Sequence, residues 1–201
     1  KKFSTGRFAT LAKSTATIIA FLSFFFFFND AYATHIAGAE ITYSYVSGNT
    51  YTVKVSFYRD CAGAAAPGNV TVNVTSASCS QTLSISCPLV GGPTQIIPVC
   101  GSVTTTCSGG SFYGVQQYVY QNNISLPAQC ADWVFSFDLG NRNNGITNIV
   151  SPGSERMYVE APLNNTIAAG DNSPSFTNSP VAMLYTNQTF CFNHGAVDLD
   201  G

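Results

Sequence analysis

Apolar and polar side chains alternate, one by one, through much of this chain. Residues 51–57 read YTVKVSF and residues 41–45 read ITYSY, so every second side chain is apolar in both stretches. Successive side chains of a β-strand point to opposite faces, and the pattern therefore predicts strands with one buried and one wet face. The intervening SGN at 47–49 has the turn residues of a hairpin.

The same alternation recurs along the chain and predicts nine or ten short strands, with no amphipathic helix. The further segments are 70–75, 83–86, 118–121, 133–139, 157–161, 181–185 and 189–192. This density predicts an all-β fold, an antiparallel immunoglobulin-like or jelly-roll-like β-sandwich. We expect Trp133, Phe135 and Phe137 at the centre of its core. Breaker-rich segments predict loops at 89–98, 107–114 and 141–148.

The start of the chain predicts a signal peptide helix that precedes the sandwich. Basic residues lead into an apolar run at 16–28, and the small residues Ala31 and Ala33 follow, one residue apart. The run is shorter than the ~20 residues of a membrane-spanning helix. We expect cleavage after Ala33, which makes Thr34 the mature amino terminus. An uncleaved signal anchor is the alternative.

The charge balance excludes a nucleic-acid-binding role. The chain has 8 Lys and Arg against 10 Asp and Glu, and charged residues make up only 9% of it. Removal of residues 1–33 leaves four basic and nine acidic side chains, a net charge of −5. No basic stripe remains that could neutralise phosphates. We expect an extracellular or outer-cell-surface protein that meets the membrane only during export.

All seven cysteines follow the predicted signal peptide, and we interpret them as disulfide candidates. They are Cys61, Cys79, Cys87, Cys100, Cys107, Cys130 and Cys191. No C-x-x-C pair favours a metal site, and export leads to an oxidising compartment. The odd number leaves one thiol free or joined to another chain. Cys100 and Cys107 bracket a short segment, and this is the pairing we predict first.

Enzymatic motifs are missing from the sequence, and we predict a chain that is not an enzyme. It has two histidines, His35 and His194, and contains neither H-E-x-x-H nor G-x-S-x-G. A glycosidase with paired carboxylates is the remaining catalytic alternative. Its candidate acids are Glu40, Asp132, Asp138, Glu155 and Glu160.

Five segments resemble, in order, a family of large secreted adhesin-type proteins of Bacteroidota. They are THIAGAEITYSY from Thr34, SFYRDC at 56–61, CADWVFSFDLGNRNNGITNI at 130–149, MYVEAPLNNT at 157–166 and FNHGAVDLDG at 192–201. The resemblance implies a module followed by tandem immunoglobulin-like or PKD-type repeats and a sorting domain for type IX secretion, as in gliding-motility-associated proteins. The chain departs from the family at Gly140-Asn141, where relatives tend to carry adjacent cysteines.

These expectations divide the chain into a signal peptide at 1–33, a sandwich module at 34–190, and the start of a cadherin- or PKD-like domain or linker at 191–201.

The predicted function is a non-catalytic structural and adhesive module of a cell-surface protein. The alternative is a carbohydrate-binding or accessory domain of a secreted hydrolase. Partners would be extracellular glycans or surface proteins and the adjacent domains. Tyr113 and Tyr118 are aromatic residues able to stack on a sugar or to fill the core.

The segment ending in DLDG predicts a calcium site. Asp198 and Asp200 lie two residues apart and precede Gly201. Positions i and i+2 of an extended chain point the same way, so both carboxylates can face one cation. Calcium takes six to eight oxygens, so further ligands would come from neighbouring residues or domains. The pattern resembles the inter-domain calcium motifs of cadherin-like repeats. The alternative is a solvated acidic linker.

Overall fold

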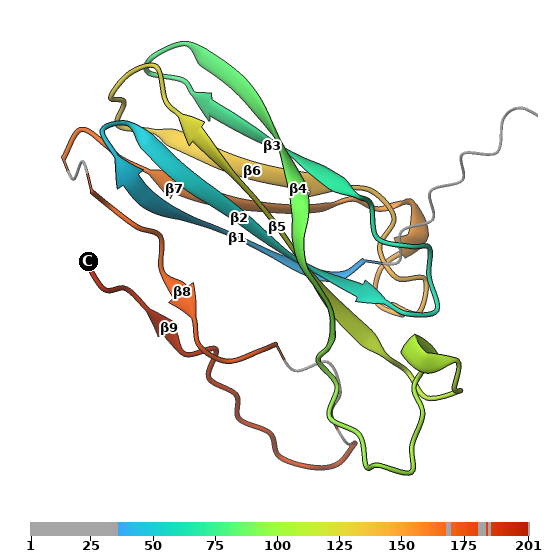
Figure 1. Ribbon diagram of the computed structural model, residues 1–201. Helices are drawn as coiled ribbons and strands as arrows, with labels where there is room; N and C mark the ends of the chain where they lie inside the picture. Colours follow the sequence, from blue (N-terminus) through green and yellow to red (C-terminus); the bar gives the residue numbers. More distant parts are fainter. Residues whose placement is uncertain (1–35, 168–169, 181–183, 185, 201) are drawn as a thin grey trace, which may run out of the picture. The chain divides into compact units, whose positions relative to one another are not determined.

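The computed structural model describes residues 36–167, 170–180, 184 and 186–200 (Figure 1). The predicted signal peptide and its cleavage residues, Ala31, Ala33 and Thr34, lie outside these residues, as does His35. No helix in the described ranges is long and apolar enough to cross a membrane.

Nine strands and two short 3₁₀ helices make up the regular structure of the described residues. They are β1 (Ile36–Ser47), β2 (Thr50–Asp60), β3 (Asn69–Ser76), β4 (Gln81–Gln95), η1 (Thr106–Ser108), β5 (Val115–Ser125), β6 (Trp133–Leu139), η2 (Pro152–Ser154), β7 (Met157–Leu163), β8 (Ser175–Phe176) and β9 (Ala196–Val197). The predicted all-β, antiparallel fold is confirmed.

Seven strands form a nearly closed sheet in the order β1-β2-β5-β4-β3-β6-β7. Residues 81–88 of β4 pair with β3, whereas residues 89–95 pair with β5. Strand β4 therefore belongs to both layers of a sandwich, one made with β1, β2 and β5 and the other with β3, β6 and β7 (Figure 1). This is the strand connectivity of immunoglobulin-like sandwiches.

The core lies between these two layers and follows from the alternation. Trp133, Phe135 and Phe137 on β6 are at most 1% exposed, as predicted. On β2, Tyr51 and Val53 are completely buried, while Lys54 between Val53 and Val55 faces solvent. Burial of each such large side chain stabilises the fold by about 1.5–3 kcal/mol.

Two of the predicted segments differ from the structure. The predicted loop at 89–98 is wrong in its first part, because β4 continues to Gln95. Its glycines allow register shifts against β5 rather than a break in pairing. The predicted strand at 189–192 is also wrong, because these residues belong to none of the strands that the structure describes; the rings of Phe190 and Phe192 stack on each other with centroids 6.1 Å apart. Most of the predicted strand at 181–185 lies outside the described residues.

Two disulfides are present, Cys61–Cys107 and Cys79–Cys130, so the predicted Cys100–Cys107 bridge is wrong. The β2–β5 ladder explains the actual pairing. It ends with Asp60 opposite Val115, and the Cys61 N–H then donates to the carbonyl of Gly114 at 2.9 Å. Tertiary pairing thus brings Cys107 to Cys61. The two disulfides indicate an oxidising environment.

Three cysteines remain as thiols among the described residues. Cys100 and Cys191 are exposed, while Cys87 is completely buried in the main core cluster. Burial raises the pKa of the Cys87 thiol. A free cysteine of this kind behaves as a small apolar side chain.

Candidate functional site

Three connections gather at one end of the sandwich, which we call the loop end. They are residues 61–68 after β2, 96–114 after β4 and 140–156 after β6. The Cys61–Cys107 disulfide joins the first two. In immunoglobulin variable domains, connections at one end of the sandwich carry recognition, and loops fixed on a rigid scaffold are common binding sites.

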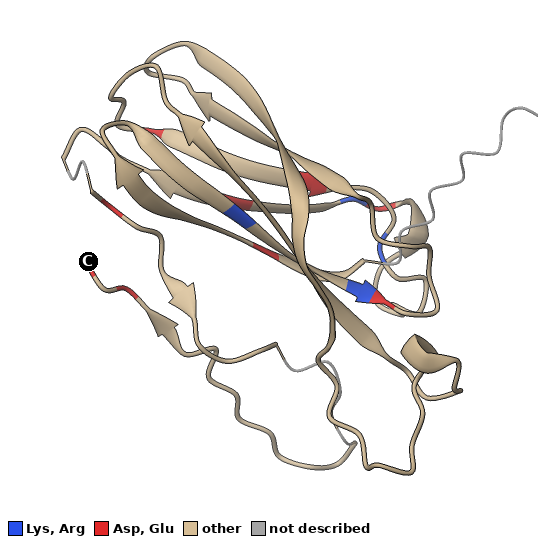
Figure 2. Cartoon of the chain, in the orientation of Figure 1, with Lys and Arg blue, Asp and Glu red and all other residues tan. Residues whose placement is uncertain are grey.

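Arg59 holds the first of these connections in place. Its guanidinium donates hydrogen bonds to the backbone carbonyls of Cys61, Gly63 and Ala64. The loop therefore closes around a cation at the end of β2, and the disulfide joins it to the connection after β4. Apart from Arg59, the strands carry few charged residues (Figure 2).

A largely apolar pocket of about 250 Å³ opens at the loop end. Its lining residues are Ile36, Ala37, Gly38, Tyr58, Ile96, Tyr113, Val115, Asn143, Ile146 and Pro180. Ligand sites in proteins are mostly apolar hollows with a few placed polar groups. The hydroxyls of Tyr58 and Tyr113 and the amide of Asn143 are the polar side-chain groups of this pocket.

Asn143 is oriented by a buried carboxylate. Asp60 is only 6% exposed, and its Oδ2 accepts a hydrogen bond from Asn143 Nδ2 at 2.7 Å. The other oxygen of Asp60 accepts from the N–H of Ala62 at 2.9 Å. Asn143 Oδ1 in turn accepts from the N–H of Gly145 at 2.7 Å. Both ends of the amide are thus fixed before any ligand arrives.

The two tyrosines of the pocket are held in their neutral form. Burial raises the pKa of Tyr58, and the Glu40 carboxylate raises it further. Burial also raises the pKa of Tyr113, followed by the charge of Asp60. Tyr113 is 36% exposed and lines the pocket, whereas Tyr118 packs against the core and donates its hydroxyl to Gln116 Oε1 at 3.1 Å.

The predicted calcium residues lie on the carboxy-terminal segment and do not form a complete cation site. Asp200 Oδ2 accepts from the backbone and side-chain nitrogens of Asn172, which lowers the pKa of Asp200. Asp198 Oδ1 lies 3.5 Å from the backbone nitrogen of Asp200. Within the described ranges, no three His, Cys, Asp or Glu side chains gather as metal ligands. Calcium binding stays a prediction for a longer protein.

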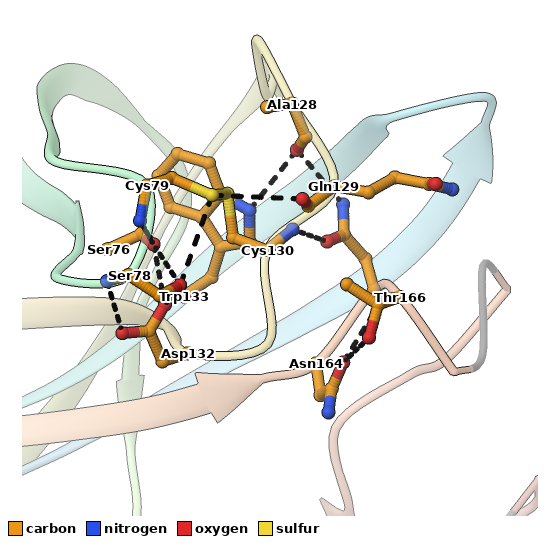
Figure 3. Close-up of a disulfide and its surroundings, with 11 residues drawn as sticks. Ser76, Ser78, Cys79, Ala128, Gln129, Cys130, Asp132, Trp133, Asn164 and Thr166 are labelled. Atoms are coloured by element: carbon orange, nitrogen blue, oxygen red, sulfur yellow. Dashed lines mark hydrogen bonds between the residues drawn. A yellow bond between two sulfur atoms is a disulfide. The ribbon is translucent and has the colours of Figure 1, made fainter.

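Most of the other acidic candidates have structural partners. Asp138 forms an ion pair with Arg156 at 2.8 Å, and Glu160 Oε2 accepts from the Tyr158 hydroxyl at 2.6 Å. Asp132 accepts hydrogen bonds from the turn that carries Cys79, at the opposite end from the pocket (Figure 3). His194 lies against Phe192, with ring centroids 4.8 Å apart.

Sequence reasoning missed the pairing of Asp60 with Asn143, which are 83 positions apart. The only local signal was an Arg-Asp pair at the end of a strand in a chain with few charges. Comparison of the chain with protein-family models, with curated proteins and with solved structures finds no significant match.

Proposed function

We propose that this chain is a non-catalytic adhesive module of a secreted cell-surface protein, and that the loop end is its binding surface. The pocket beside Tyr113 and Asn143 is the observation that carries the proposal. It combines apolar walls with a fixed amide, so it can take an apolar group of an extracellular partner and select it by hydrogen bonding.

The disulfides support a role outside the cell. Each disulfide lies at a different end of the sandwich: Cys61–Cys107 is at the loop end, and Cys79–Cys130 is at the β3–β4 turn. A binding surface that is fixed before contact loses less conformational entropy on association. The family resemblance supports the same role and extends the proposal to the amino-terminal module of a long, repeat-containing adhesin exported by type IX secretion.

The alternative role is a carbohydrate-binding accessory domain of a secreted hydrolase. The partly exposed Tyr113 ring beside the Asn143 amide favours it, because aromatic rings and amides are common sugar contacts. The sequence of the full-length gene product separates the two roles. Repeats beyond this module would support the adhesin, and a catalytic domain would support the accessory role.

Adhesion can be tested with the exported chain on arrays of extracellular proteins and glycans. We expect the chain to bind at least one class of molecule on the arrays. We expect it to release no cleaved glycan or peptide. Tyr113→Ala should weaken retention about tenfold, since removal of a central contact in an interface commonly costs over 1 kcal/mol. Tyr158→Ala is a matched control, because Tyr158 is an exposed tyrosine on β7 outside the pocket.

Three outcomes would contradict this function. If the chain binds to no array, it has no adhesive role. If it cleaves a glycan to which it binds, it is not a non-catalytic module. An equal loss of retention in the Tyr113 and Tyr158 variants would place binding away from the loop end.

A further inference from the structure

A second hollow lies on the outer face of the β1-β2-β5 layer, and we call it the sheet groove. It has a volume of about 410 Å³. Thr42, Lys54 and Gln121 form part of its floor. These three residues are direct neighbours in the sheet, because Thr42 on β1 pairs with Lys54 on β2, which pairs with Gln121 on β5.

The wall of the sheet groove is the carboxy-terminal segment, which is anchored to the edge of β1. Ser173 and Tyr43 exchange hydrogen bonds, from Ser173 N–H to the Tyr43 carbonyl at 3.1 Å and from Tyr43 N–H to Ser173 Oγ at 2.9 Å. The Tyr45 N–H donates to Asn172 Oδ1 at 2.8 Å. Val197 and Leu199 add apolar surface to this wall.

Lys54 is the distinctive group of this floor. Its side chain is exposed, and it makes no hydrogen bond or ion pair with any other described residue. A smaller hollow of about 140 Å³ shares Thr42 and Lys54 with the sheet groove and adds Glu40. The surface thus presents one cation, Lys54, beside neutral hydroxyl and amide groups. The Glu40 carboxylate lies further along β1, and the Asp200 carboxylate lies on the wall, where it accepts hydrogen bonds from Asn172.

We propose that the sheet groove binds an acidic saccharide, of the uronic acid type. A sugar carboxylate would form an ion pair with Lys54. Ring hydroxyls would donate to Glu40 and exchange hydrogen bonds with Thr42 and Gln121, because hydroxyl and amide groups can both donate and accept. The C–H face of a sugar ring fits the apolar side chains of Val197 and Leu199 on the wall.

The net charge of the chain does not help it to bind an anion. The formal net charge is −2, so the overall field does not attract a polyanion. Binding of an acidic sugar must therefore depend on the Lys54 ammonium itself. The floor is polar, which favours a saccharide over a peptide with apolar side chains. This site is distinct from the loop-end pocket, and its test does not depend on the adhesive role.

Calorimetric titration of the exported chain with a galacturonate hexasaccharide tests the proposal. We expect saturable binding that is at least tenfold weaker in Lys54→Gln and retained in Lys54→Arg. The methyl-esterified hexasaccharide, which has the same rings without the charges, should bind wild type at least tenfold more weakly. Arg156→Gln removes the same charge from the β6–β7 connection, outside the sheet groove, and should leave binding within twofold of wild type.

The proposal fails if the galacturonate probe does not bind, or if Lys54→Gln binds as wild type does. Equal weakening in Arg156→Gln would show bulk electrostatics instead of a site. Equal, Lys54-dependent binding of a hexaglutamate peptide would show an acidic-peptide site instead. Lys54 is exposed on a strand, so its variants should keep the wild-type unfolding midpoint, which is measured on the same samples. Tyr113→Ala should still bind the probe, which separates this site from the loop end.

Discussion

Asp132 organises the turn between β3 and β4 through one carboxylate. Its Oδ1 accepts from the hydroxyls of Ser76 and Ser78 at 2.6 and 2.5 Å, and its Oδ2 accepts from the Ser78 N–H at 2.8 Å (Figure 3). These hydrogen bonds lower the pKa of Asp132 from 3.8 to about 2. The neighbouring Cys79–Cys130 disulfide and the buried Trp133 belong to the same region of the fold.

The lowered pKa of Asp132 predicts an acid-sensitive contribution to stability. Because the pKa is lower in the folded state, the contribution is complete above about pH 4 and is lost as the pH falls towards 2. In Asp132→Asn this part of the pH dependence should be missing from the urea unfolding midpoint. Glu155→Gln serves as a carboxylate control. An unchanged pH profile in Asp132→Asn would contradict the prediction.

Strand β4 joins the two layers, and Gly92 lies in the part of β4 that pairs with β5. Gly92 has a φ of +97°, and a side chain there would collide with the backbone carbonyl oxygen of Gln117 on β5. The register shifts between β4 and β5 occur on either side of Gly91. A glycine at this position is thus required both by its backbone conformation and by the close approach of β5.

Gly92→Ala should lower the free energy of unfolding by about 1–3 kcal/mol, the usual cost of one strained backbone position. Gly68→Ala is a suitable control, because nothing lies within 4 Å of the added Cβ. Urea denaturation of both variants measures the difference. Equal stabilities would mean that the β4–β5 contact adjusts without strain.

The Cys61–Cys107 disulfide should be a major contributor to stability. Its cysteines are 46 positions apart, and loop closure of that length stabilises the folded state by about 4 kcal/mol in the chain-entropy model. The double variant Cys61→Ala, Cys107→Ala should lose stability of this order in urea denaturation. Cys100→Ala removes an exposed thiol and should not change it. A similar stability for both variants would argue against the observed pairing.

At the scale of the whole molecule, the sequence predicted the features that depend on local pattern, namely the buried faces of strands and the first hairpin. The alternation around Val53 and Phe135 identified buried faces, and the Gly48-Asn49 turn identified the first hairpin. The shared strand β4 was missed, because the Gly91-Gly92-Pro93 run has the composition of a loop and only pairing with β5 makes it a strand.

The candidate site was less predictable for the same reason. The loop segment around Asn143 was visible as a turn, but its contact with Asp60 depends on how β6 and β2 are placed in space. The disulfides also connect residues that only the completed ladders bring together. Long-range pairing therefore decides the site, and alternation alone does not specify it.

Hydrogen exchange of the chain, free and with a partner to which it binds on the arrays, tests the loop-end binding surface most directly. We expect slower exchange at backbone amides in residues 96–115 and 141–146, which line or border the pocket. Amides in the turn at 77–80 and in residues 126–132, at the opposite end, should exchange as in the free chain. Protection at that opposite end, with none in the loops, would contradict the proposed binding surface.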